Sequence, residues 1–109
     1  MKKKDIVQKQ KDFNTIIENN KFLKSDFFVI YLKKKETENP KYGIAAGKKL
    51  GNAVLRNKLK RQYRRIIDNN KFLFPKYTDY IIMVKKASLT ATFTQMNDCL
   101  RNLLESVKE

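Results

Sequence analysis

Residues 53–69 combine a helical spacing of apolar side chains with a dense series of cations, and they constrain the fold more than any other segment. At about 100° per residue, one side of such a helix carries the apolar residues Leu55, Leu59, Tyr63 and Ile66, with Ile67 at its margin. Asn52 stands directly before this segment, where its side chain can cap the first turn. The pattern predicts a long amphipathic helix whose apolar side packs on another layer.

The other apolar residues predict three strands and two further helices. Strands are expected at residues 26–34, 41–47 and 80–84, which lie between turn signals. A short helix is expected at residues 12–20. A final helix should begin after Thr90 or Thr92 and carry an apolar stripe formed by Phe93, Met96, Leu100, Leu103, Leu104 and Val107.

The first predicted strand is apolar on both faces, which favours a central position in a sheet. Its period of two places Phe27, Val29 and Tyr31 on one face and Phe28, Ile30 and Leu32 on the other. Spacing alone favours core packing over base stacking for Phe27 and Tyr31, because aromatic side chains are usually buried.

The order of these elements is helix, strand, strand, helix, strand, helix. A third short strand could follow the second one, before the long helix. This order is typical of an α+β fold, an α/β sandwich in which helices pack on a small mixed sheet. A length of 109 residues suits a single domain, residues 1–109. Within it, residues 1–11 have only Ile6 and Val7 to bury after the initial Met, so we predict a basic, extended and partly ordered N-terminal arm.

The chain has 25 Lys and Arg residues against 11 Asp and Glu residues, for a formal charge of +14. Such a charge repels itself and predicts a polyanionic partner. No apolar run is long enough to span a bilayer, and the N-terminus is too polar for a signal peptide. We therefore expect a cytoplasmic protein without membrane contact.

No arrangement in the sequence is typical of catalysis or of metal binding. Cys99 is the single cysteine and histidine is absent, which excludes an internal disulfide and leaves no zinc ligand set. We expect Cys99 to be a small buried thiol on the last helix. Neither a carboxylate pair nor a phosphate-binding glycine loop is present. We predict no catalytic residue and no metal site in this chain.

The cations of the long helix form neighbouring rows, with Arg56, Lys60 and Arg64 in one row, Asn57, Arg61 and Arg65 in the next, and Lys58 beside them. We expect these cations to share one exposed face. Like charges at this spacing destabilise a helix by about 0.2–0.5 kcal/mol per pair, so an external anion should neutralise them. Lys48 and Lys49 add to a phosphate-binding footprint that suits RNA or DNA. A merely solvated basic helix and a membrane-surface helix are the weaker alternatives.

Residues 48–64 resemble the basic motif of bacterial ribonuclease P proteins, with the sequence KKLGNAVLRNKLKRQYR. A looser likeness covers nearly the whole chain, including Asp12-Phe13, residues 28–31, residues 79–82 and the closing helix. The resemblance implies the fold of the second domain of a small-subunit ribosomal protein. It also implies an accessory protein that binds the catalytic RNA subunit and helps it to remove the 5′ leader of precursor tRNA. Mg²⁺ would be bound mainly by the RNA, and no protein partner would be required.

The predicted RNA-binding residues are Lys48, Lys49, Asn52, Arg56, Asn57, Lys58, Lys60, Arg61, Arg64 and Arg65. By resemblance, a central cleft for the leader would contain Phe13, Ile17, Tyr31, Lys60 and Arg64. Ile17 stands where many relatives place an aromatic residue. The main alternative is a ribosomal or other structural RNA-binding protein with no role in cleavage, which charge alone does not separate from the first hypothesis. A protein-only nuclease is a distant third.

Overall fold

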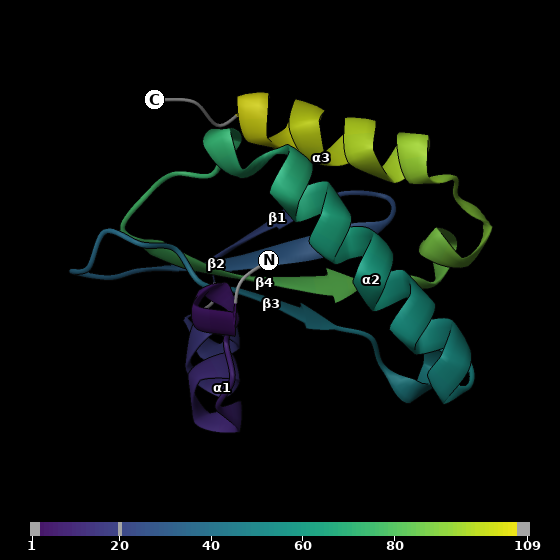
Figure 1. Ribbon diagram of the computed structural model, residues 1–109, viewed down its shortest axis with the longest axis horizontal. Coiled ribbons are helices and arrows are strands. Elements are labelled where there is room, and N and C mark those ends of the chain that lie inside the picture. The colour runs from purple at the N-terminus through teal and green to yellow at the C-terminus, as the bar shows by residue number, and fades with distance from the viewer. Residues whose placement is uncertain (1–2, 20, 107–109) are drawn as a thin grey trace.

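The computed structural model describes residues 3–19 and 21–106, and within them four strands form one mixed sheet (Figure 1). The strands are β1 (Phe22–Lys24), β2 (Phe28–Lys34), β3 (Tyr42–Ala45) and β4 (Thr78–Val84). Their order in the sheet is β1-β2-β4-β3. β2 pairs antiparallel with both β1 and β4, whereas β3 and β4 are parallel. The predicted central position of the first long strand is confirmed.

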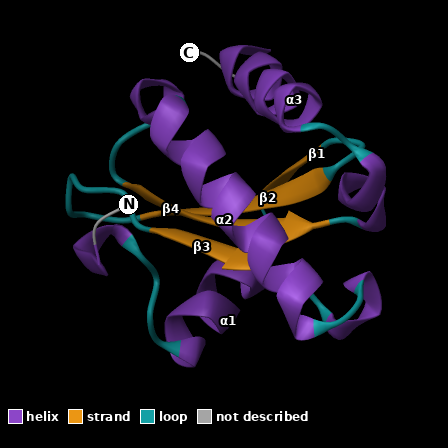
Figure 2. Cartoon of the chain, turned by 45° about the vertical axis from the view of Figure 1, so that its right-hand side comes forward, coloured by secondary structure: helices purple, strands orange, loops and turns teal. Residues whose placement is uncertain are grey.

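Three helices cover the two faces of the sheet: α1 (Gln10–Glu18), α2 (Ala53–Asn69) and α3 (Phe93–Ser106). α2 and α3 lie on one face and α1 lies on the other, as both views show (Figures 1 and 2). The larger core lies between the sheet and the α2–α3 layer, and it includes Phe28, Ile30 and Leu32. A smaller cluster centred on Ile16 and Ile81 lies beneath α1. The predicted α+β sandwich with a small mixed sheet is confirmed.

Several predicted bounds differ from those of the structure. α2 has the predicted limits, and Thr92 rather than Thr90 caps α3 by accepting a hydrogen bond from the N–H of Gln95 at 3.1 Å. A further short strand exists as β1, but it precedes the first predicted strand instead of following the second. Phe27 was expected on the face of Tyr31, but it precedes β2 and packs against the larger core. Its backbone lies outside the regular alternation of the strand, so the period of two does not apply to it.

The N-terminal segment packs more closely than the predicted arm. Residues 1 and 2 lie outside the described residues, and Lys3–Asp5 form a short 3-10 turn, η1. Ile6 then forms an isolated parallel bridge with Tyr42 on β3, and the N–H of Val7 donates to the carbonyl of Tyr42 at 2.9 Å. Val7 is only 5% exposed. Two apolar residues are therefore enough to attach the segment to the sheet beside β3.

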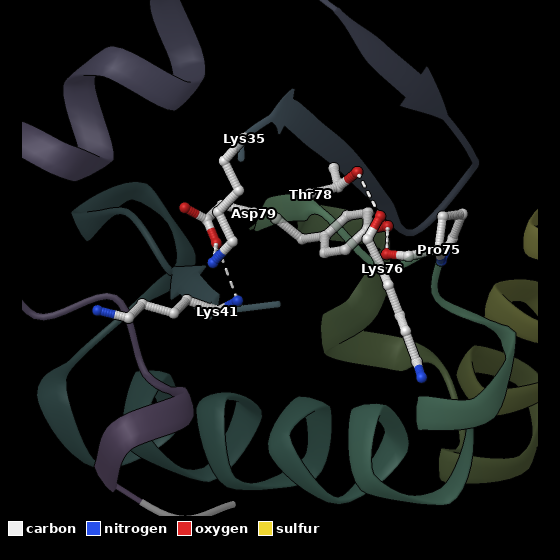
Figure 3. A network of polar contacts seen from close by, with 7 residues as sticks. Lys35, Lys41, Pro75, Lys76, Thr78 and Asp79 are labelled. Carbon is white, nitrogen blue, oxygen red and sulfur yellow. Dashed lines mark hydrogen bonds and ion pairs between the residues drawn. The ribbon is translucent and has the colours of Figure 1, made fainter. Parts of the chain in front are cut away.

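Asp79 connects the ends of three strands (Figure 3). Its Oδ1 accepts the backbone N–H of Lys41 at 3.0 Å and pairs with Lys35 Nζ at 2.5 Å. On the same strand, the hydroxyl of Tyr80 donates to the carbonyl of Pro75 at 2.6 Å. The two contacts of Asp79 hold the connection between β2 and β3 against the start of β4, and the Tyr80 bond holds the loop that precedes β4.

Buried polar contacts fix α2 relative to its neighbours. Ser88 Oγ donates to the carbonyl of Phe27 at 2.8 Å and lies 2.7 Å from the hydroxyl of Tyr63. Because a serine hydroxyl has one proton, Tyr63 is the donor to Ser88. At the other end of α2, the fully buried amide of Asn70 donates to the carbonyl of Ile66 at 2.8 Å and to Asn97 on α3 at 3.0 Å. The rotation of α2 about its axis is thereby set.

Candidate nucleic-acid interface

The start of α2 is defined by a glycine and a cap. Gly51 has a φ of +136°, a backbone conformation that side chains disfavour, and it reverses the chain after the 3-10 turn η2 (Lys48–Leu50). Asn52 Oδ1 then accepts the N–H of Leu55 at 2.9 Å. Lys48, Lys49 and Asn52 are all exposed. The acceptor of the Asn52 side chain is used for capping, which leaves its NH₂ group for a partner.

The sequence predicted that the cations of α2 share one exposed face, and this prediction is wrong. Arg56 and Lys60 are half-buried, whereas the remaining predicted contacts on the helix are exposed: Asn57, Lys58, Arg61, Arg64 and Arg65. Arg56 precedes Tyr63 by seven residues, a rotation that returns to within about 20° of the same direction. It therefore lies close to the apolar side of the helix. Its buried Nε has no hydrogen-bond partner in the described part of the chain.

Lys60 and Arg64 line a cleft between α2, β3, α1 and the N-terminal segment. This cleft has a volume of about 210 Å³, and its other lining residues are Ile6, Val7, Phe13, Tyr42, Gly43 and Ile44. We call it the α1-side cleft. The structure thus brings Phe13, Lys60 and Arg64 together, although Phe13 and Lys60 are 47 positions apart in the sequence.

Phe13 reaches this cleft because β3 has a glycine beneath its ring. A Cβ atom at Gly43 would lie 2.7 Å from Cζ of Phe13 and 2.6 Å from Cδ1 of Ile81. Both distances are shorter than any normal contact, so only glycine permits this packing. A small residue in a strand thus lets another element approach the backbone closely.

Ile17 and Tyr31 lie near Phe13 but do not line the α1-side cleft. Both are half-buried and pack with Phe13 in the small cluster beneath α1. The ring of Tyr31 lies 5.9 Å from that of Phe22, measured between centroids. Of the five residues predicted for the leader, Phe13, Ile17 and Tyr31 therefore pack together on the α1 face of the sheet. Lys60 and Arg64 reach the α1-side cleft from α2, which lies on the other face.

A second groove lies on the opposite flank of α2, beside the start of α3. It has a volume of about 360 Å³ and is lined by Lys58, Arg61, Gln62, Arg65 and Phe93. We call it the α3-side groove. Gln62 and Phe93 were not among the predicted site residues, since Phe93 fits the apolar stripe of α3 and Gln62 carries no charge. Only the packing of α3 beside α2 reveals them.

The positive charge of α2 is not compensated by ion pairs within the described residues. In residues 3–19 and 21–106, none of its Lys and Arg side chains forms an ion pair. The carboxylates of Asp5 and Asp68 instead pair with Lys71, at 3.3 and 3.4 Å. A surface of this kind attracts phosphate groups and gives binding that depends on salt.

The described residues contain no cluster of three or more Asp, Glu or Cys side chains that could hold a metal ion. Burial raises the pKa of the Tyr63 hydroxyl to about 12 and also raises the pKa of Tyr42, so neither ionises near neutral pH. Cys99 is half-buried against the larger core rather than fully buried. None of the described helices is both long and apolar enough to cross a membrane.

The sequence model of the family described as ribonuclease P matches residues 1–108. The chain belongs to the ribonuclease P protein family. The ribonuclease P protein component of Mycoplasma capricolum is 40% identical over 109 residues, which cover 99% of this chain and all of that protein. The ribonuclease P protein component of Streptococcus pneumoniae is 33% identical over 108 residues, covering 99% of this chain and 85% of that protein.

Solved structures of ribonuclease P proteins share the fold. The protein from Thermotoga maritima superposes with a TM-score of 0.84 at 30% identity, covering 95% of this chain and 98% of that chain. The protein from Staphylococcus aureus gives the same TM-score and identity, with 95% of each chain covered. Family membership makes this chain an accessory subunit of the endoribonuclease, and a ribosomal role without cleavage is not favoured.

Proposed function

We propose that this ribonuclease P protein binds the catalytic RNA subunit through α2 and the preceding turn, and the 5′ leader of precursor tRNA through the α1-side cleft. The observation that carries the proposal is the joining of an aromatic ring to two cations, Phe13 with Lys60 and Arg64, beside a helix of uncompensated charge. In this role the chain assists removal of the leader to give the mature 5′ end.

Docking to the RNA subunit is assigned to the exposed cations. Lys48 and Lys49 continue the charge of α2 beyond its first turn, and the guanidinium groups of Arg61 and Arg65 can each contact a phosphate through two parallel hydrogen bonds. Asn57 lies among these cations and can bond a ribose or a base edge. Arg56 is half-buried and offers less surface to RNA than the exposed cations. Its buried Nε suggests that it orients the edge of the contact nearest the protein core.

The leader is assigned to the α1-side cleft because an unpaired strand offers both bases and phosphates. Stacking of a base on an aromatic ring contributes about 1–3 kcal/mol, and Phe13 supplies such a ring at the cleft. Lys60 and Arg64 would hold the phosphates beside it. Ile17 and Tyr31 extend this surface along the face of the sheet, with Ile17 offering apolar contact in place of stacking.

The chemistry of cleavage is assigned to the RNA subunit, where bound Mg²⁺ would activate the attacking water. The described residues of this chain offer no cluster of metal ligands, and its own contribution is to hold phosphates and to orient the leader. We place this activity in the cytoplasm, with no further protein partner required.

Reconstitution with the cognate RNA subunit at low Mg²⁺ tests the proposal. We expect the protein to increase cleavage of precursor tRNA, and the protein alone to cleave nothing. An RNA subunit that gains no activity from the protein would sink the proposal. Cleavage by the protein without RNA would favour a protein-only nuclease.

Two variants separate the two contacts. Arg61→Ala should weaken binding of the RNA subunit, while Phe13→Leu should reduce affinity only for precursor tRNA that carries a leader. Lys24→Ala is the matched control, because Lys24 is an exposed cation on β1, at the sheet edge opposite β3. Equal losses in Lys24→Ala and Arg61→Ala would show that net charge alone is responsible.

A further inference from the structure

We propose that the α3-side groove binds one unpaired nucleotide, whose base stacks on Phe93 while Lys58, Arg61 and Arg65 hold its phosphates. The proposal rests on the proposed function, since it assumes that α2 docks on RNA. It adds a second, base-contacting site on the flank of α2 that faces away from the leader cleft.

The groove has the parts of a nucleotide site rather than of a phosphate site alone. Phe93 is half-buried and lines a space of about 360 Å³, which lies within the usual range of about 300–1,000 Å³ for small-ligand sites. Gln62 lies beside it, and its side-chain amide makes no hydrogen bond within the described residues. An amide has both donors and an acceptor, so Gln62 can pair with a base edge that stacks on Phe93.

The three cations point toward one flank of the helix. Lys58, Arg61 and Arg65 fall within about 60° of one another around α2 and extend over about 10 Å of its axis. None of them forms an ion pair in the described part of the chain. Lys60 and Arg64 point toward the α1-side cleft instead. The helix therefore offers two separate tracks of positive charge, each next to one phenylalanine.

An unpaired nucleotide suits this groove better than a duplex. Bases within a helix hide their faces in the stack, whereas bases in loops, bulges and single strands can stack on a protein ring. The groove between α2 and α3 is concave and presents the ring of Phe93 at its wall. A loop or bulge of the RNA subunit, or a single-stranded part of the precursor, meets these conditions.

Phe93 packs partly against the larger core, and the start of α3 that carries it is fixed before any RNA binds. Thr92 and Gln95 cap α3 reciprocally, since the N–H of Thr92 donates to Gln95 Oε1 at 2.9 Å and the N–H of Gln95 donates to Thr92 Oγ1 at 3.1 Å. The buried Asn70 joins the far end of α2 to Asn97 on α3. A groove with fixed walls binds its ligand at a smaller cost in conformational entropy.

The test compares Phe93→Leu with Phe93→Tyr, because leucine keeps an apolar side chain and tyrosine keeps the ring. We expect Phe93→Leu to bind RNA about tenfold more weakly and Phe93→Tyr to stay close to the wild type. Phe72→Leu is the control for losing an exposed ring, since Phe72 is 77% exposed elsewhere on the surface. Urea denaturation of each variant confirms that the protein is folded at the assay temperature.

Two binding measurements identify the source of the nucleotide. A loss of affinity for the RNA subunit alone places the nucleotide in that RNA, and a loss confined to precursor tRNA on the preassembled complex places it in the substrate. Equal losses in Phe93→Leu and Phe93→Tyr, or no loss in either measurement, would overturn the groove proposal. If only the groove proposal fails, Arg61→Ala should still weaken RNA binding. If Arg61→Ala binds RNA as tightly as the wild type, the proposed function fails as well.

Discussion

Gly43 shows how a single hydrogen atom in place of a side chain shapes the α1-side cleft. We expect Gly43→Ala to lower the free energy of unfolding by about 1–3 kcal/mol, because the new methyl group would overlap Phe13 and Ile81. Moving the ring of Phe13 should also reduce affinity for precursor tRNA with a leader. Urea denaturation and binding with leader-containing and leaderless substrates measure the two effects.

Gly47→Ala is the matched control for this change. A Cβ atom at Gly47 would have nothing within 4 Å, and its φ of −70° suits any residue. This variant should keep both stability and affinity. A Gly43→Ala protein that behaves like Gly47→Ala would show that the packing of Phe13 on β3 is not needed.

The buried hydroxyl of Tyr63 predicts how stability depends on alkaline pH. Its pKa is raised to about 12 by burial, against about 10 in an unfolded chain. Its contribution is complete below pH 10 and is lost as the pH rises toward 12, because the unfolded chain releases the proton first. The free energy of unfolding should therefore fall less steeply between pH 10 and 12 in Tyr63→Phe than in the wild type. Parallel curves for the two proteins would contradict this.

At the scale of elements, the bounds of α2 could be predicted because several signals agree. The cap at Asn52, the apolar spacing and the break after Asn69 all point to the same limits. β1 could not be predicted, since three residues carry too little pattern and the strand exists through its pairing with β2. The helical wheel places Arg56 beside Tyr63 on the apolar side, so its partial burial could have been predicted. The prediction was wrong here because it grouped Arg56 with Lys60 and Arg64 as one row of exposed cations.

The cap at the start of α2 contributes to the stability of the protein. Asn52→Ala should lower the free energy of unfolding by about 1 kcal/mol, because the N–H of Leu55 loses its acceptor. Asn57→Ala lies within the same helix and is exposed, so it should change stability much less. Urea denaturation of both variants decides this, and similar midpoints would show that the cap contributes nothing.

At the scale of the whole molecule, the two sites are products of tertiary packing. The α1-side cleft takes residues from four segments of the chain, and the α3-side groove joins two helices that lie on the same face of the sheet. The sequence predicted most of the cations from their density on one helix. It could not predict which cations face α1 and which face α3, because that depends on the rotation of α2 on the sheet.

The salt dependence of RNA binding reports the size of the whole surface. With about six phosphate contacts, log affinity should fall against log salt with a slope of about 0.7–0.9 per contact. Arg61→Ala should reduce the magnitude of this slope by about one contact, and Lys24→Ala should leave it unchanged. A flat response would contradict a footprint built on phosphates.

If both proposed contacts are made, the position of α2 between the two grooves would also keep two RNA strands apart. RNA strands repel one another, and a catalytic RNA must still bring its substrate close to its own backbone. A helix with its side chains is about 10–12 Å wide. With cations on both flanks, α2 would hold leader and RNA subunit at that separation and screen each from the charge of the other.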